Sequence, residues 1–286
     1  MTEPRFLRDT EDDSEGHEGV PRVLVELRPP LAGLGRTERM DAWIDLADAI
    51  GRFVRDGHSI LLTDDAVGEA EEENLSHSLA NLGREVPRER IVPILTCKHT
   101  LEYCELYAQR AAAAGLDTLT VVGGDPGGPP RCVPHAWELR RRLRDLVPDM
   151  GLFGWANPHR DPDEQFGFLS RDFHADASLT QIVTPDSPGH LEALATRIDA
   201  EGLELPLIAG VFHFHNASPA RLEMLGRFFP VPAEEITRAF ERGVEPEAYT
   251  ASAIRTALEA GARTVYVSNV GVTGGPRRLR RILERV

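Results

Sequence analysis

The segment Thr118–Pro130 places a carboxylate where a ligand could be held. An apolar, β-rich run ends there in Gly123 and Gly124, and Asp125 follows at once, before a proline. Glycine lets the backbone approach a ligand closely, and a fixed carboxylate can accept two hydrogen bonds from one ligand edge. An Asp-Pro step also closes strands as a simple turn, so the segment alone leaves both interpretations open.

A second carboxylate, Glu26, ends the first apolar run, between Val25 and Leu27. Apolar surroundings disfavour the charged form of a carboxylic acid and raise its pKa, so this residue could carry a proton near neutral pH. The chemistry would be general acid catalysis. The alternative is structural, because Glu26 could instead form an ion pair with Arg28.

Polar residues also end or follow most of the other apolar runs. They are Thr63, Asp64, Asp65, Thr96, Lys98, His99, Asn157, His159, Gln181, His213, His215 and Asn269. Each of them could contact a ligand or could simply end its strand.

His213 and His215 lie two residues apart near a strand end, and therefore on one strand face. Metal-dependent barrel hydrolases use such pairs, because alternate strand residues converge on one ion. The further ligands would come from His159, His174, Asp64, Asp65 and Asp125. Those hydrolases usually carry the pair on the first strand, which here supplies Glu26. Substrate contact by the two histidines is therefore the preferred interpretation, and no metal is predicted.

A repeating order of strands and helices would position these residues. Apolar runs of strand length lie at Val23–Leu27, Ser59–Thr63, Ile91–Thr96, Thr118–Val122, Gly151–Trp155, Ser178–Thr184, Pro206–Phe214 and Thr264–Val270. Amphipathic stretches separate them, such as Met40–Val54, Leu101–Ala114, His135–Leu146, Leu191–Ala200 and Tyr249–Ala260. Eight such units predict an α/β fold, a single closed (β/α)8 TIM barrel with its site at the C-terminal strand ends. An open doubly wound sheet is the alternative, but no G-x-G-x-x-G follows the first strand.

Composition limits the domains, the partners and the location. Residues 1–20 are acidic without periodic apolar positions, which predicts a disordered acidic tail before one barrel at 21–286. The net charge of −14 argues against nucleic acid and anionic membranes as partners. Cys97, Cys104 and Cys132 lack C-x-x-C spacing, and no signal or membrane-spanning stretch is present, so a reduced, cytoplasmic setting is expected.

Two charged segments have a simple solvated interpretation. Glu69–Asn74 reads as an exposed acidic loop and helix start. Gly271–Pro276 opens a short helix that carries four arginines between Arg277 and Arg281. A glycine-rich loop at a helix N-terminus after the last strand could hold a phosphate or a carboxylate, or the helix could simply be solvated.

Four of the strand ends together resemble methylenetetrahydrofolate reductase, a barrel enzyme that reduces methylenetetrahydrofolate to methyltetrahydrofolate. The similar segments are Val25–Pro30 with its glutamate and Pro-Pro pair, Leu95–Cys97 with Ala112–Leu116, Val121–Pro126, and Ala156–His159 with Asp163–Phe173 and Ala175–Ala177. They follow the family's order over most of Arg22–Val286.

The resemblance implies roles for several residues. Glu26 matches the general acid, which protonates the departing nitrogen as the methylene bridge opens to an iminium. Asp125 matches the aspartate that holds the pterin. Thr63 matches a polar position near the flavin ring. Gln181, two residues before the aligned position Val183, stands in for a glutamine that contacts the substrate.

The same resemblance predicts NAD(P)H as the hydride donor and FAD as a cofactor whose contacts are largely replaced. Asn157 and His159 fall in the fourth similar segment and are expected at the cofactor. Arg171 would substitute for a phosphate-binding lysine, which aligns with Asp172, and a substrate-stacking aromatic aligns with Ala217. Either FAD is held differently, or hydride passes directly from NAD(P)H to the folate.

The predicted function is therefore a cytoplasmic folate oxidoreductase of one-carbon metabolism and methionine biosynthesis, with a tetrahydrofolate as substrate and with a homo-oligomer allowed. Two alternatives stay open. One is a metal-dependent barrel hydrolase built on His213 and His215. The other is a barrel that has lost the reaction and serves as a binding subunit.

Overall fold

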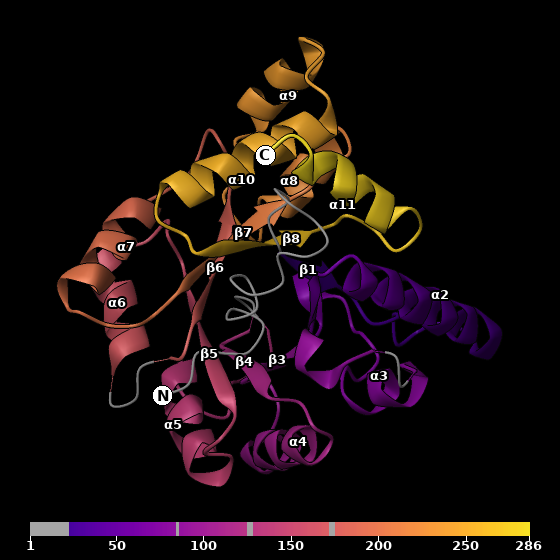
Figure 1. The fold of residues 1–286 in the computed structure, drawn as a ribbon, viewed down its shortest axis with the longest axis vertical. Coiled ribbons are helices and arrows are strands. Elements are labelled where there is room, and N and C mark those ends of the chain that lie inside the picture. The colour runs from indigo at the N-terminus through magenta and orange to yellow at the C-terminus, as the bar shows by residue number, and fades with distance from the viewer. Residues whose placement is uncertain (1–22, 84–85, 125–127, 172–174) are drawn as a thin grey trace.

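The computed structural model describes residues 23–83, 86–124, 128–171 and 175–286. Eight parallel strands close into a barrel in the order β1 to β8, surrounded by helices (Figure 1). The strands are β1 (Leu24–Leu27), β2 (Ser59–Leu62), β3 (Ile91–Thr96), β4 (Thr118–Val122), β5 (Gly151–Ala156), β6 (Ser178–Val183), β7 (Leu207–Phe212) and β8 (Thr264–Ser268). β1 pairs with β8 through Leu24 and Tyr266, which closes the barrel and confirms the predicted fold.

Helices follow the strands along the chain. They are α2 (Arg36–Arg55), α3 (Ser76–Asn81), α4 (Leu101–Ala113), α5 (Ala136–Leu146), α6 (Pro162–Ser170), α7 (Leu191–Ala200), α8 (Pro219–Leu225), α9 (Ala233–Glu241), α10 (Pro246–Glu259) and α11 (Gly275–Leu283). Short 3-10 turns, η1 (Ala66–Gly68) and η2 (Arg88–Arg90), precede α3 and β3. This is the alternation that the sequence pattern predicts.

Alternating side chains divide the apolar core into two layers. One set of strand residues, including Leu24 and Phe153, faces the barrel interior. The alternate set, including Val25 and Leu62, packs against the surrounding helices. Because both faces of the sheet are covered, its strands read as continuous apolar runs in the sequence.

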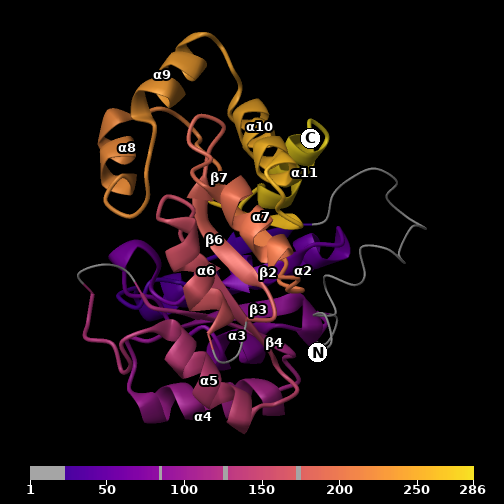
Figure 2. The ribbon, with the colours of Figure 1, turned by 90° about the vertical axis from the view of Figure 1, so that its left-hand side faces the viewer.

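Two helices after β7 were not expected from the sequence. α8 and α9 form a hairpin that extends beyond the barrel wall (Figure 2). Its buried residues Leu222, Leu225 and Ile236 join the same apolar cluster as Phe214 and Tyr249. The predicted strand at Pro206–Phe214 is shorter in the structure, where β7 runs from Leu207 to Phe212.

Some predictions fall on residues outside the described ranges. The expected tail at 1–20 and the carboxylate Asp125 both lie there. Within the described ranges, no helix combines the length and the apolar character that a membrane span requires.

Candidate functional site

Tyr266 forms the floor of the barrel mouth. Its ring is buried inside the barrel, and its hydroxyl donates to the Thr180 carbonyl at 2.7 Å. Gly210 on the neighbouring strand makes room for it, since a Cβ there would lie 2.4 Å from the Tyr266 hydroxyl oxygen. The ring of Trp155 lies beside it, with 6.0 Å between ring centroids. The interior is therefore filled by side chains at this layer.

Glu26 lies above that floor, at the C-terminal end of β1. Ser268, at the end of β8, donates a hydrogen bond to Glu26 Oε1 at 2.7 Å. Burial raises the pKa of Glu26 to about 7; the Ser268 hydrogen bond and Arg28 oppose this rise, and the nearby Glu71 charge adds to it. A carboxyl group in this state is partly protonated at neutral pH, which suits a general acid.

Glu71 is a second carboxylate beside Glu26, and its burial corrects the expectation of a solvated acidic loop. Its side chain is 1% exposed. Oε2 accepts from the Thr63 hydroxyl at 2.7 Å and from the Asp65 amide at 2.9 Å, and Oε1 accepts from Arg28 Nε at 2.6 Å. These bonds compensate for the desolvation of a buried charge. Charge runs predict solvent exposure only on average, and here one member of the run turns inward.

Arg28 is consequently held by acids other than Glu26. Besides Glu71, it pairs with Glu69 at 2.8 Å and donates to the Ala66 carbonyl at 3.1 Å. The structural alternative for Glu26, a direct ion pair with Arg28, is absent from the bonds between described residues. Glu26 therefore keeps its proton affinity.

A charged clamp joins the ends of β2 and β3. Asp64 Oδ2 accepts from the Thr96 amide at 2.9 Å and the Thr96 hydroxyl at 2.7 Å. Lys98 Nζ lies 2.9 Å from Asp64 and 2.6 Å from Asp65, and His99 Nε2 lies 3.0 Å from Asp64. Burial opposes ionisation of Asp64, but His99, Lys98 and Thr96 outweigh it and lower its pKa to about 2. The sequence predicted these residues at strand ends, and their bonds to one another hold the ends of β2 and β3 together.

The residues expected at the cofactor make bonds within the protein. The Thr63 hydroxyl donates to Glu71. Asn157 accepts from the His159 amide at 3.0 Å, and His159 Nε2 lies 2.9 Å from the Ile182 carbonyl. Arg171, at the end of α6, lies 5.7 Å from the ring centroid of Trp137. Their cofactor roles stay predictions, and the bonds shown here position loops.

Gln181 reaches from β6 to the loop between α8 and α9. Its Nε2 donates to the Phe228 carbonyl at 3.2 Å, and its Oε1 accepts from the Ile182 amide at 2.9 Å. Phe228 also lies 3.9 Å from the position of a Cβ on Gly68, in the turn after β2. The loop thus links the β6 end to the β2 end across the mouth, and Gln181 anchors it there.

His213 and His215 face the helix side of β7 rather than the barrel interior. His213 is buried, and its Nδ1 lies 2.8 Å from the Thr250 hydroxyl on α10. The two imidazole rings meet edge to face at 4.6 Å. Burial and nearby arginines lower the pKa of both, that of His213 to about 3. Within the described residues, no group of three or more metal-ligating side chains comes together.

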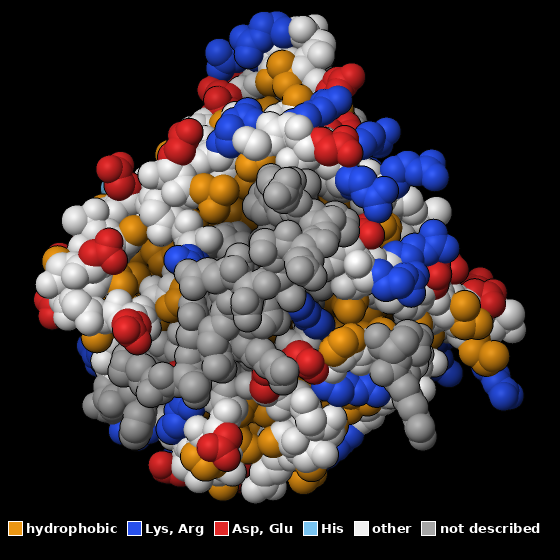
Figure 3. All heavy atoms as spheres, in the orientation of Figure 1, with side chains coloured by type: hydrophobic (Ala, Val, Ile, Leu, Met, Phe, Trp, Pro, Cys, Tyr) orange, Lys and Arg blue, Asp and Glu red, His pale blue; other side chains and the backbone are white. Residues whose placement is uncertain are grey.

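The residues present do not offer an evident flavin site. Each described residue that the resemblance assigned to the cofactor already has a protein partner, as given above. Arginines do gather over α11 on one face of the molecule (Figure 3). Of these, Arg280 pairs with Asp56 and Arg281 with Glu247. A bound flavin would have to replace several of these contacts.

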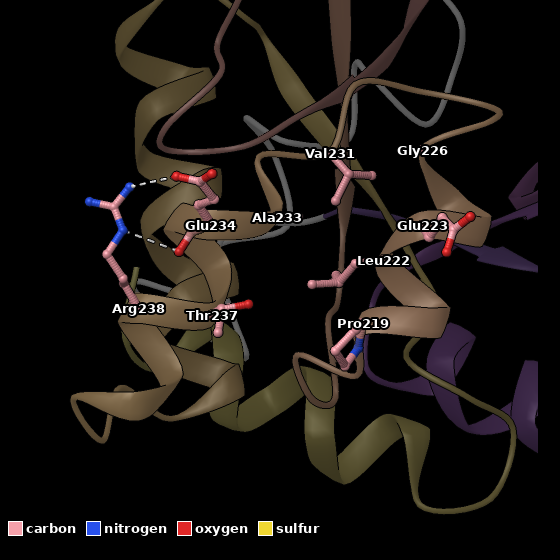
Figure 4. Close-up of a pocket in the computed structure, with 9 residues that line it drawn as sticks. All are labelled: Pro219, Leu222, Glu223, Gly226, Val231, Ala233, Glu234, Thr237 and Arg238. Atoms are coloured by element: carbon pink, nitrogen blue, oxygen red, sulfur yellow. Dashed lines mark hydrogen bonds and ion pairs between the residues drawn. The ribbon is translucent and has the colours of Figure 1, made fainter.

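A separate cavity of about 630 Å³ lies between α8 and α9 (Figure 4). Its walls include Leu222, Val231 and Thr237, and Arg238 is held at its edge by Glu234 and Glu235. It lies on the hairpin rather than at the strand ends. Its charged lining residues, Glu223, Glu234 and Arg238, all lie on α8 and α9, so the cavity is separate from the site at Glu26.

The sequence did not indicate Ser268 or Glu71 as residues of the site, for two different reasons. Ser268 could have been found, because barrel closure puts the end of β8 beside the end of β1, and alternation turns Ser268 inward with Tyr266. Glu71 could not, because its position depends on how the loop after β2 folds back over Thr63.

The fold and the site together define a closed barrel with a protonatable carboxyl group at its strand ends. No protein-family model matches the chain, and no curated relative does. A Clostridium thermocellum protein described as binding two copies of 5-methyl-5,6,7,8-tetrahydrofolic acid is similar over 93% of this chain and 96% of its own, with 13% identity and a TM-score of 0.65.

Flavin oxidases share the fold more distantly. A Pediococcus acidilactici lactate oxidase is 13% identical, with a TM-score of 0.54 over 95% of this chain and 72% of its own. A mandelate oxidase variant carrying an FMN adduct is also 13% identical, with a TM-score of 0.51 over 92% and 72%. At these identities the comparisons establish the barrel fold alone.

Proposed function

We propose that this chain is an oxidoreductase that reduces 5,10-methylenetetrahydrofolate to 5-methyltetrahydrofolate with NAD(P)H. The observation that carries the proposal is Glu26, whose pKa of about 7 and bond to Ser268 provide a proton at the strand ends. The reaction needs a proton on the departing nitrogen before hydride can reach the carbon. A folate-binding barrel of nearly the same length supports the choice of substrate.

Glu26 performs the proton step in this proposal. As the methylene bridge opens, the Glu26 carboxyl group gives its proton to the leaving nitrogen and becomes a carboxylate. Ser268, which donates to Oε1, stabilises that carboxylate and fixes its direction. The reduced nicotinamide supplies the hydride.

The remaining predicted contacts belong to the same proposal. Asp125, which follows β4 in the sequence, would hold the amino-pyrimidine edge of the pterin. Trp155 and Phe212, inward-facing and partly exposed, would provide aromatic surface for the rings of the two substrates. Direct hydride transfer from NAD(P)H to the folate is preferred over a flavin relay, because Thr63, Asn157 and His159 are engaged within the protein.

The test is a turnover assay combined with a visible spectrum of the purified full-length chain. The proposal expects a colourless protein that oxidises NAD(P)H only when methylenetetrahydrofolate is added, with methyltetrahydrofolate as the product. Flavin absorption that bleaches with NAD(P)H and returns with the folate would replace direct transfer by a flavin relay. No folate-dependent oxidation under either condition would contradict the function and favour a binding subunit.

A further inference from the structure

The fold brings the three cysteines of the chain to one place. Cys97 directly follows β3, Cys104 lies on α4, and Cys132 lies in the loop between β4 and α5. Cys132 donates its amide hydrogen to the Cys97 carbonyl at 2.7 Å. Its side chain is close enough to those of Cys97 and Cys104 to raise the pKa of both thiols. The sequence spacing gave no sign of this cluster.

The three thiols differ in access. Cys97 and Cys104 are fully buried, whereas Cys132 is half-buried. Cys104 Sγ lies 3.8 Å from the Thr96 carbonyl, to which its thiol donates. A reagent arriving from solvent therefore meets Cys132 first.

Cys97 has basic neighbours that Cys104 lacks. Arg140, on α5, is 4% exposed, and its Nε has no hydrogen-bond partner among the residues that the structure describes. Arg131, next to Cys132, packs over Gly123, where a Cβ would lie 2.9 Å from its guanidinium carbon. Burial and the neighbouring Cys132 raise the pKa of Cys97 to about 12, while Arg131 and Arg140 oppose that rise. Guanidinium groups stabilise a thiolate, which is the reactive form of cysteine.

From this arrangement we propose that Cys132 and Cys97 form a reversible disulfide that tethers the loop between β4 and α5 to the end of β3. The oxidant is a low-molecular-weight disulfide. The Cys132 thiolate attacks one of its sulfur atoms and expels one thiolate, which leaves a mixed disulfide on Cys132. Cys97 then loses its proton, attacks the Cys132 sulfur and expels the second small thiolate. Two protein thiols are oxidised and one small disulfide is reduced to two thiols.

The tether would act on a loop that is already fastened at one point. Arg131 Nη2 donates to the Gly124 carbonyl at 3.2 Å, and the Cys132 amide holds the Cys97 carbonyl. A disulfide at Cys132 would replace this hydrogen-bonded attachment by a covalent one, which lasts until a reductant is added. The proposal does not depend on folate, nicotinamide or flavin, so its outcome is separate from that of the proposed function.

The second step should be slow and should depend on pH. It needs the Cys97 thiolate, whose surroundings are Cys104 on α4, Arg140 on α5 and both Arg131 and Cys132 on the loop. Below a pKa of about 12 the thiolate fraction rises about tenfold per pH unit. Closure of the disulfide is therefore expected to accelerate about tenfold from pH 7.5 to pH 8.5.

The experiment treats the folded full-length chain with oxidised glutathione, quenches it with acid, alkylates the free thiols and maps the disulfides by mass spectrometry. The proposal expects one internal bond, Cys97 to Cys132, that dithiothreitol reverses. Cys104→Ser should form the same bond. Cys97→Ser should accumulate glutathione on Cys132, and Cys132→Ser should keep both remaining thiols free.

Three results would overturn the proposal: no internal disulfide in the wild-type protein, a bond between Cys97 and Cys104 instead, or equal oxidation of Cys132→Ser. Circular dichroism before oxidation shows whether each variant is folded. Where a serine variant is not folded, the alanine variant takes its place. Slower tryptic cleavage after Arg131 in the oxidised protein than in the reduced protein is the second expected readout of a tethered loop; equal cleavage rates would contradict the tether.

Discussion

At the scale of residues, the site is governed by the different states of two neighbouring carboxyl groups. Glu26 accepts a hydrogen bond from the Ser268 hydroxyl and has a pKa raised to about 7, so it is partly protonated at neutral pH. Burial raises the pKa of Glu71 as well, but Arg28, Thr63 and two backbone amides bind its oxygens and favour the carboxylate. Two acids of the same chemistry are thus assigned different roles by their surroundings.

This difference predicts how pH affects the stability of the fold. The folded pKa of Glu26 is raised from 4.5 to about 7, so between these values the folded chain binds more protons than the unfolded chain. Stability contributed by this group is therefore lost as pH rises through that window. Glu26→Gln removes the penalty and should be more stable than wild type at pH 8, by on the order of 2 kcal/mol. Urea unfolding of both proteins at pH 5 and pH 8 measures this difference in the free energy of unfolding. An equal stability gain at the two pH values would contradict the prediction.

A second prediction concerns the pH profile of folate reduction. Because the acid must be protonated, kcat/KM should fall about tenfold per pH unit above the pKa of Glu26. Glu71→Gln removes a negative neighbour and releases Arg28, and both changes lower the pKa of Glu26. The descending limb should therefore move to lower pH. Glu69→Gln removes the exposed partner of Arg28 and is the matched control. An unmoved limb in Glu71→Gln would refute this coupling.

At the scale of elements, the strand ends are joined by side chains from the loops that follow them. Asp64 and Lys98 clamp β2 to β3, and Asn74 donates to carbonyls of Leu62, Thr63 and Ile94 on the same pair of strands. Parallel strands in a barrel cannot be joined by tight hairpins, so such bonds fix the geometry of the mouth.

Asp64→Asn should weaken this clamp. The pKa of Asp64 is lowered to about 2 from 3.8, so its contribution is present at neutral pH and is lost as pH falls through about 4 to 2. The variant should be destabilised by about 2 kcal/mol at pH 7. The deficit should shrink toward pH 2.5. Asp48→Asn, which breaks an exposed pair with Arg52, should cost less than about 0.5 kcal/mol. Urea titrations of the three proteins measure both; a pH-independent deficit would contradict the assignment.

The sequence predicted most elements because apolar period and glycine stops mark them. The predicted run Ile91–Thr96 agrees with β3 at both ends, since both of its faces are buried. α8 and α9 were missed because they are short and pack on a satellite of the core that only the folded chain creates.

The sequence predicted only part of the candidate site. Glu26 was found because it ends an apolar run at the expected edge of the barrel. The orientation of His213 and His215 was not, because alternation fixes only that they share a face, and the face is decided by α10 through Thr250. Glu71 was predicted to be solvent-exposed, because its partners, Arg28 and Thr63, come from other parts of the chain.

At the scale of the whole molecule, eight strands and their helices bring the ends of β1 and β8 together across the full length of the chain. Glu26 and Ser268 are 242 residues apart in the sequence, yet Ser268 Oγ lies 2.7 Å from Glu26 Oε1. The proton-carrying site therefore exists only in the closed barrel. This juxtaposition underlies the proposed reduction of a folate by a barrel of the same architecture as a folate-binding protein.

The most direct test is turnover of methylenetetrahydrofolate and NAD(P)H by Glu26→Gln, with Glu102→Gln on the exposed face of α4 as the control. Nicotinamide absorbance reports the rate, and fluorescence or calorimetry reports folate binding. We expect Glu26→Gln to lose at least about 100-fold in turnover while it still binds folate, and the control to match wild type. Unchanged turnover by Glu26→Gln would contradict the proposal that Glu26 is the general acid.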